Sequence, residues 1–298
     1  MNPLLPDRYP NQDFFIADIL DAMPKDDMAS MEHPMFSLAT QPDLSVREYG
    51  NSSCKITITP SVLGLATIWD KDILIYCISQ LMAGINRGRT PSQIIQVTAH
   101  DLLVSTNRET GGINYKRLVA SFKRLEGTRI QTSLATNGEV VHEGFGMIDR
   151  WKIVERSELD NRMVALEVKL SDWLYNAVLG KELLTISRSY FRLRGGLERR
   201  LYELARKHCG AQNRWRISIE KLHEKSGAKG TEKLFRSRVK KISIANVLPD
   251  YRLSYNSEKD QLIVYNRNGK KAAKAMFDDD IKQLFKPVKN KRQASFNF

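Results

Sequence analysis

The chain has 298 residues, of which 42% are hydrophobic and 27% are charged, and its formal net charge is +13. These proportions are typical of a folded globular protein and exclude an intrinsically disordered chain. The longest apolar stretch lies near Ile73–Ile78 and is far shorter than the ~20 residues that a membrane helix needs. The acidic N-terminus lacks the basic and apolar regions of a secretory signal. We therefore expect a cytoplasmic protein with no membrane partner, and the positive charge predicts an anionic partner, nucleic acid first.

The reactive residues do not form a pattern typical of catalysis. Cys54, Cys77 and Cys209 are odd in number and far apart, which fits neither a disulfide framework nor a metal site. The histidines form no metal-binding motif, and neither Gly-Lys pair precedes the Ser or Thr of a phosphate-binding loop. Asp278–Asp280 resembles part of a two-metal carboxylate site, but three consecutive acids on a helix cannot face one ion. We therefore expect no enzyme, no cofactor and no bound metal.

The charge is distributed unevenly along the chain. Residues 1–60 contain nine acidic residues and four basic ones, so the positive charge belongs to the rest of the chain. Residues 1–50 are also rich in Pro, Asp and Met, which predicts an irregular acidic extension with short elements. The body that follows is therefore the candidate for contact with an anionic partner.

The first half of the body predicts a strand, a long helix, a second strand, a short helix, a basic helix and a hairpin. Asn137-Gly138 is the strongest hairpin signal, and Trp151–Val154 is expected to extend the sheet of that hairpin. The predicted elements are Ile56–Ile58, Ser61–Ala83, Ile94–Thr98, His100–Ser105, Asn114–Glu126, Arg129–Leu134 and Glu139–Phe145.

The same order recurs in the second half. The predicted elements are Val164–Leu170, Trp173–Leu179, Leu197–His208, Trp215–Ile219, Glu220–Ser226, Thr231–Ile242, Tyr251–Tyr255 and Gln261–Asn266. A short helix, a turn, a basic helix and a hairpin in this order are typical of a winged-helix unit. The sequence therefore predicts an α+β protein with two tandem winged-helix domains. The expected divisions are an extension over residues 1–50, domains over 51–158 and 159–268, and a flexible tail over 269–298.

Both basic helices are amphipathic. At 100° per residue the first places Leu118, Phe122 and Leu125 on one face, and the second does the same with Phe235, Val239 and Ile242. The opposite face of each carries a small residue between lysines, which would let the helix enter a major groove while Lys and Arg reach phosphates or guanine. The alternative interpretation is an ordinary solvated face. We expect DNA contacts from Lys116, Arg117, Lys123 and Arg124 in the first helix, and from Lys233, Arg236, Ser237, Lys240 and Lys241 in the second.

The two hairpin tips are weaker candidates for DNA contact. The expected tips are Ala135–Glu139 and Asn256–Asp260, and both contain acidic residues. Because carboxylates repel phosphate, we do not expect either tip to lie on the DNA backbone.

Three longer runs resemble the plasmid replication initiator protein A family. They are Met28–Leu38 (MASMEHPMFSL), Ala66–Tyr76 (ATIWDKDILIY) and Leu197–Gly210 (LERRLYELARKHCG), and the resemblance covers about residues 20–265. It implies a bacterial initiator of tandem winged-helix domains that binds double-stranded DNA at direct repeats (iterons) in a plasmid origin and helps to melt an AT-rich segment. It also implies recruitment of the host replication initiator and replicative helicase, and repression of its own promoter by a homodimer.

The C-terminal tail contains Gln283-Leu284-Phe285, which resembles a shortened motif for binding the bacterial sliding clamp. The favoured interpretation of the same residues is an ordinary short amphipathic helix in which Leu284 and Phe285 join Phe277 and Ile281. The tail therefore leaves the clamp open as a partner.

Three other functions remain open at this point. A transcriptional repressor of the same fold would bind one promoter operator and have no role in replication. A nickase or primase would need metal ligands that the sequence does not display. A scaffold would use the basic faces to bind acidic proteins and would show little salt-dependent affinity for DNA.

Overall fold

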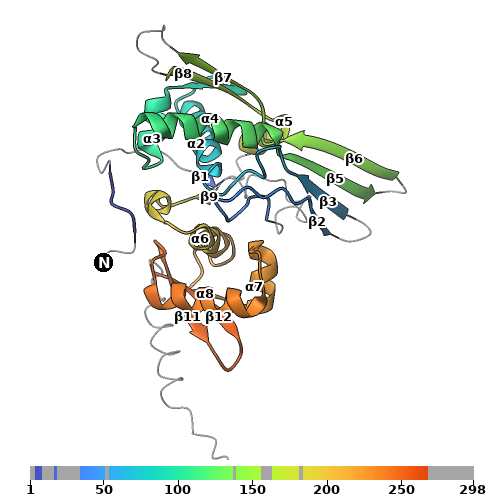
Figure 1. Cartoon of the computed structure of the whole chain (residues 1–298), viewed down its shortest axis with the longest axis vertical. Helices are drawn as coiled ribbons and strands as arrows, with labels where there is room; N and C mark the ends of the chain where they lie inside the picture. The colour runs from blue at the N-terminus through green and yellow to red at the C-terminus, as the bar shows by residue number, and fades with distance from the viewer. Residues whose placement is uncertain are drawn as a thin grey trace, which may run out of the picture.

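The protein is described by a computed structural model that covers residues 4–8, 17–18, 34–50, 54–136, 139–155, 163–180 and 184–267. Figure 1 shows two groups of elements, one at each end of the molecule, with helix α6 (Gly196–His208) between them. We call the described residues from 34 to the end of α5 the first unit, and we call α6 together with the group from β10 to β12 the second unit. Gln283-Leu284-Phe285, the other residues of the predicted tail and Asp278–Asp280 lie outside the described residues.

Helix α2 (Lys71–Asn86) is the central helix of the first unit, and it starts later than predicted. The predicted first turns, from Ser61 onward, instead form a tight turn in which Gly64 has a φ of 91°. Reciprocal hydrogen bonds then close the turn directly before the helix, because the Thr67 N–H donates to the Asp70 carboxylate at 2.8 Å and the Asp70 N–H donates to the Thr67 hydroxyl at 3.3 Å. The apolar spacing before Asp70 reflects turn residues packed into the core, and the prediction of a helix there was wrong.

The next three elements of the first unit match their predictions closely. They are strand β4 (Ile94–Val97), helix α3 (Ala99–Ser105) and helix α4 (Gly112–Gly127). The Thr98 hydroxyl caps α3 by accepting the Asp101 N–H at 3.0 Å. Leu118, Phe122 and Leu125 of α4 are fully buried, as the helical periodicity predicts.

The two strands of the predicted hairpin are paired, whereas Asn137 and Gly138 lie outside the described residues. The sheet that contains these strands differs from the expected one. Strands β5 (Arg129–Thr136) and β6 (Glu139–Gly146) join β2 (Arg47–Gly50) and β3 (Cys54–Thr59) in the order β2-β3-β5-β6. Strand β4 takes no part in this sheet. The hairpin therefore does not pair with the strand that precedes the short helix, as the wing of a winged-helix unit would.

A second hairpin occupies that position. Strand β7 (Ile148–Glu155) pairs with β8 (Met163–Leu170), and β8 pairs with β4, in the order β4-β8-β7. The prediction that Trp151–Val154 extends the β5–β6 sheet was therefore wrong. The Trp151 ring stacks on Phe122 of α4 with centroids 5.6 Å apart, and its Nε1 donates to Glu126 at 2.9 Å. These contacts fix β7 beside α4.

This pairing also affects the predicted divisions of the chain. The hairpin β7–β8 spans the expected boundary between residues 158 and 159. Helix α5 (Asp172–Leu179) follows, and its Trp173 stacks on Phe145 of β6 at 5.0 Å. In the expected extension, β2 pairs with β3, and Met35 and Phe36 are buried in the core. We propose that the first unit starts near residue 34 and ends with α5.

The second unit follows the predicted order throughout. After the 3-10 helix η3 (Arg188–Arg192) and α6, it contains one three-stranded sheet with the order β10-β12-β11. A separate small sheet pairs β1 (Ala17–Asp18) with β9 (Leu184–Thr185). The elements of the second unit after α6 are β10 (Arg214–Ser218), α7 (Ile219–Ser226), α8 (Glu232–Ala245), β11 (Tyr251–Asn256) and β12 (Gln261–Asn266).

Buried ion pairs connect α6 to the start of α2. Lys71 Nζ lies 2.8 Å from Glu203, and Arg199 lies 2.7 Å from Asp72. All four side chains are almost completely buried, and the Tyr190 hydroxyl also donates to Glu203 at 2.8 Å. Buried charges are tolerated only when they are paired in this way. The two units therefore share one connected core with a polar junction.

The α7–α8 turn also contacts the first unit. Lys229 of this turn donates to Asp43 at 2.7 Å, and Arg47 donates to the same carboxylate at 2.9 Å. Gly227 has a φ of 67°, and a Cβ there would lie 2.4 Å from Pro34. These close contacts fix the start of α8 relative to the first unit. No helix within the described ranges is long and apolar enough to cross a membrane.

Candidate nucleic-acid interface

Helix α8 is held rigidly in the second unit by its caps and its buried side. The Thr231 hydroxyl accepts the Leu234 N–H at the N-terminus, and Asn246 ends the helix with a φ of 52°. Phe235 and Val239 are buried, and His223 of α7 stacks on Phe235 with centroids 4.5 Å apart. The remaining sides of α8 are thus presented in a fixed orientation.

The outward side of α8 carries three of the five residues predicted to contact DNA. Lys233, Ser237 and Lys241 are exposed, and they share this side with Arg238 and Leu234. Arg238 was missed by the sequence analysis, although its position next to Ser237 was a signal for it. The periodicity identifies the face opposite the core, but it does not show which flank of the helix is covered by neighbouring elements.

Arg236 and Lys240 lie on the flank that the β11–β12 hairpin covers. Arg236 donates to the Asp260 carboxylate through Nε at 2.9 Å and Nη2 at 2.7 Å, and it also pairs with Glu232. Lys240 Nζ lies 4.6 Å from the centre of the Tyr255 ring. Both side chains thus contact the hairpin, so we propose positioning roles for them in place of the predicted DNA contacts.

The contact between Arg236 and Asp260 also affects the ionisation of both side chains. Hydrogen bonds from Arg236 lower the pKa of Asp260, and hydrogen bonds to Asp260 raise the pKa of Arg236. The Tyr255 hydroxyl donates to the same carboxylate at 2.5 Å. Asp260, which we expected to repel phosphate, is therefore an ionised carboxylate paired with Arg236 of α8, whereas Glu258 at the tip is exposed.

In α4, Lys116, Arg117 and Lys123 are exposed as predicted, but Arg124 is not. Arg124 binds the buried Asp70 through Nε and Nη2, both at 2.7 Å. These hydrogen bonds raise the pKa of Arg124 and join α4 to the start of α2. We therefore propose that Arg124 positions α4 and makes no DNA contact.

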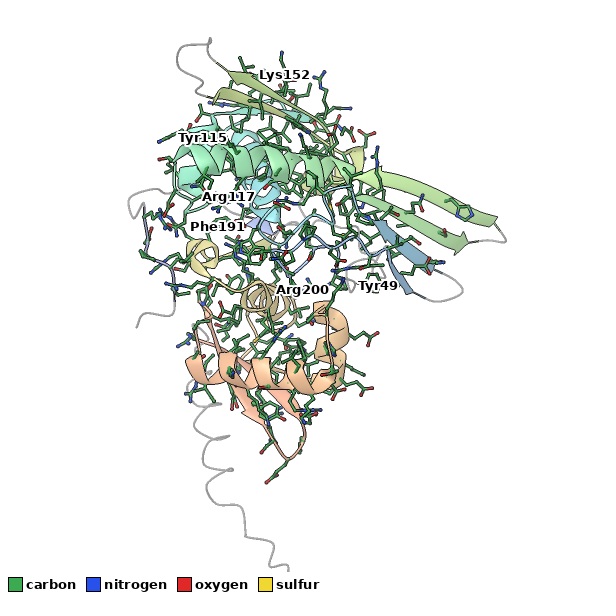
Figure 2. The ribbon with its side chains drawn as sticks, viewed as in Figure 1. Tyr49, Tyr115, Arg117, Lys152, Phe191 and Arg200 are labelled. Carbon is green, nitrogen blue, oxygen red and sulfur yellow. The ribbon has the colours of Figure 1, made fainter. Side chains whose placement is uncertain are left out.

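A cavity of about 520 Å³ borders the same flank of α4. Figure 2 shows Arg117 on the side of α4 that faces η3 and α6, and this residue lines the cavity. The facing wall is formed by two segments of the chain before α2. The lining residues are Thr40, Gln41, Pro42, Leu63, Leu65, Thr67, Trp69, Asp70, Arg108, Asn114, Arg117, Ala120, Ser121 and Arg124. The outward face of α4 is therefore bordered on one flank by the segments that precede α2.

The two buried cysteines and His208 are packed against other side chains of the fold. Burial raises the pKa of the Cys77 thiol to about 12 and that of Cys209 to about 11, which disfavours the nucleophilic thiolate. His208 stacks on Trp215 with centroids 4.7 Å apart. Within the described residues, no three His, Cys, Asp or Glu side chains are grouped to hold a metal ion.

Comparisons with known proteins agree with the resemblance in the sequence. The profile of the family "Replication initiator protein A" matches residues 25–253. A relative from Wigglesworthia glossinidia brevipalpis, named a putative replication protein, is 40% identical over 253 residues, which are 84% of this chain and 91% of the relative.

Two crystal structures of RctB domains 2 and 3 show a similar mixed α and β fold. The first has a TM-score of 0.60 at 14% identity and covers 82% of this chain and 98% of the RctB chain. The second has a TM-score of 0.55 at 12% identity and covers 80% and 96%. The family match over most of the chain leads to one conclusion: the chain belongs to the replication initiator protein A family.

Proposed function

We propose that this replication initiator binds double-stranded DNA sequence-specifically and that α8 is its recognition helix. The observation that carries the proposal is the outward side of α8, where Lys233, Ser237, Arg238 and Lys241 are exposed on a capped helix. Side chains of this kind hydrogen-bond to base edges and phosphates when a helix lies in the major groove. A net charge of +13 supplies the attraction to the DNA backbone.

Both units have the element order of a winged-helix domain. In the second unit β10, α7, α8 and the β11–β12 hairpin follow in sequence, with the sheet order β10-β12-β11. In the first unit β4, α3, α4 and the β7–β8 hairpin follow in sequence, with the sheet order β4-β8-β7. These matching orders support two tandem winged-helix domains, with β5–β6 as an added hairpin in the first.

The two domains have different roles in this proposal. Helix α8 contacts base edges, whereas Lys116 and Lys123 of α4 contact phosphates, because the wall beside Arg117 limits how deeply α4 can enter a groove. Two helices on one chain cover a longer site than one does, which suits the direct repeats of a plasmid origin. Repression of its own promoter, a homodimer, and recruitment of the host initiator, helicase or sliding clamp remain proposals that rest on the family resemblance.

A footprinting experiment tests this function. The purified chain is incubated with the DNA that flanks its own gene, at physiological salt and with excess competitor DNA. Protection of regularly spaced direct repeats is the expected result. A single protected site at the promoter would indicate a repressor instead, and uniform coverage that the competitor removes would contradict sequence-specific binding.

A further inference from the structure

Two exposed apolar residues lie among the basic residues on the outward side of α8. Leu234 is 46% exposed in the first turn of the helix, and Ile244 is 85% exposed near its end. With Ser237, Arg238 and Lys241 they form one strip, because these residues recur at intervals of three or four. An isolated exposed leucine is ordinary in a protein surface. Its place in this strip is what distinguishes Leu234.

Leu234 is also held in place before any DNA binds. Its N–H donates to the Thr231 cap, and its Cδ2 lies 3.5 Å from the point where a Cβ on Gly230 would stand. Gly230 has a φ of 105°, which favours glycine and brings the turn close to the leucine side chain. The backbone that carries Leu234 is therefore ordered before any partner binds, so contact with a partner does not have to order this turn.

The chemistry of the strip points to a particular feature of DNA. In the major groove, the C5 methyl group of thymine is the apolar feature of a base edge, and it is contacted by apolar side chains. Residues in the N-terminal part of a recognition helix are those that reach the base edges. Leu234 is the third residue of α8, one turn before Ser237 and Arg238, whereas Ile244 lies in its last turn.

We propose that Leu234 recognises a thymine methyl group in the DNA site, next to the bases that Ser237 and Arg238 reach. The inference rests on the proposed role of α8, and it adds the chemical class of base that the helix selects. A thymine-containing step is then required at a fixed position in the site, because a cytosine or a uracil there lacks the methyl group that Leu234 covers.

Replacing thymine with deoxyuridine tests this directly, because the change removes only the methyl group. A duplex is first selected from a random library by the full chain, and each thymine is then replaced singly. The Kd of each duplex is measured by fluorescence anisotropy at fixed salt. For the wild-type chain we expect about fourfold weaker binding at one position, or at two adjacent positions, the loss that follows from one buried methyl group.

Two variants assign the effect to its residue. Leu234→Ala is expected to bind the thymine and uracil duplexes equally at that position, whereas Ile244→Ala, the matched exposed apolar residue, keeps the fourfold difference. Indifference of the wild-type chain to every replacement would overturn the inference, as would a difference that survives in Leu234→Ala. If the library yields no enriched sequence, the proposed function itself fails, which is a separate outcome.

Discussion

The two basic helices have the same pattern and different surroundings. If the buried Leu118 and Phe122 of α4 are aligned with Phe235 and Val239 of α8, Arg117 and Ser121 correspond to Leu234 and Arg238. In α4 this flank lines the cavity beside the segments before α2. In α8 the same flank is exposed to solvent.

The other flank is alike in both helices. A hairpin covers it in each, with Trp151 of β7 bound to Glu126 of α4, and Asp260 bound to Arg236 of α8. A basic amphipathic helix is therefore available for base recognition only where neighbouring elements leave a flank of it exposed. On this account the second unit selects the DNA sequence, and the first adds affinity.

The largest expected effect is at the buried ion pairs between α2 and α6. These pairs connect the unit that contains α4 to the unit that contains α8. Glu203→Gln leaves the completely buried Lys71 ammonium without its carboxylate, and we expect unfolding to become easier by about 3–5 kcal/mol. Urea denaturation measures this loss. Glu48→Gln, whose pair with Lys55 is more than half exposed, is the matched control and should change stability by less than about 1 kcal/mol. Equal effects of the two variants would contradict the proposed importance of the junction.

The second prediction concerns the contact between the α7–α8 turn and the first unit. Burial alone would raise the pKa of Asp43, but hydrogen bonds from Lys229, Ser45 and Arg47 outweigh it and lower the pKa well below the ordinary 3.8. We therefore expect Asp43→Asn to lower stability at pH 7 by about 1.5–3 kcal/mol.

The pH dependence of that loss has a definite sign. Because the folded-state pKa of Asp43 is depressed, its contribution is fully present above the unfolded value of 3.8 and is lost progressively as the pH falls from there through the lower folded-state pKa. The difference between the wild-type chain and Asp43→Asn should therefore shrink between pH 5 and pH 3 in urea titrations. A difference that stays constant over this range would show that the carboxylate charge is not responsible.

The third prediction separates base contact from phosphate contact. Arg238→Ala is expected to weaken binding to the selected duplex by about 1–3 kcal/mol, and to weaken binding to unrelated duplexes much less. Lys116→Ala in α4 is the comparison, and it should weaken binding to all duplexes alike while lowering the salt slope by about 1. Anisotropy titrations at several salt concentrations measure both quantities. A uniform loss in Arg238→Ala would assign that residue to phosphate.

The smallest effect is expected where Arg236 meets the hairpin. If Arg236 positions the hairpin through Asp260, then Arg236→Ala and Asp260→Asn should weaken DNA binding to a similar small extent, and the double variant should add nothing. If Arg236 contacts DNA instead, removing Asp260 would free the guanidinium and strengthen binding. Opposite signs for the two single variants would therefore contradict the positioning role.

Local elements of the fold could be predicted from the sequence, because periodicity and caps are local signals. The basic helices α4 and α8 and both Asn-containing hairpins lie within a few residues of their expected ranges. The predicted start of α2 was wrong, because the apolar turn residues before Asp70 have the spacing of a helical repeat. The predicted sheet for the strand that contains Trp151 was also wrong, because the residue pattern of one strand does not show which neighbouring strand it pairs with.

The candidate site could be predicted only in part for a similar reason. Periodicity correctly placed Lys116, Lys123 and Lys241 at the surface. It could not show that Arg124 binds Asp70, which lies 54 residues earlier, or that Arg236 binds Asp260. Ion pairs between distant segments form only in the packed fold. The sequence alone therefore does not show which basic side chains are free to contact DNA and which are held in ion pairs.

Site selection with two matched double variants tests whether α8, and not α4, selects the DNA sequence. Lys116→Ala with Lys123→Ala removes the exposed lysines of α4, and Arg238→Ala with Lys241→Ala removes two exposed cations of α8. Each variant and the wild-type chain select duplexes from one random library, which is then sequenced. We predict that the α4 variant enriches the same motif with weaker binding, while the α8 variant loses the motif. A motif that changes in the α4 variant and persists in the α8 variant would show that α4 is the helix that selects the sequence.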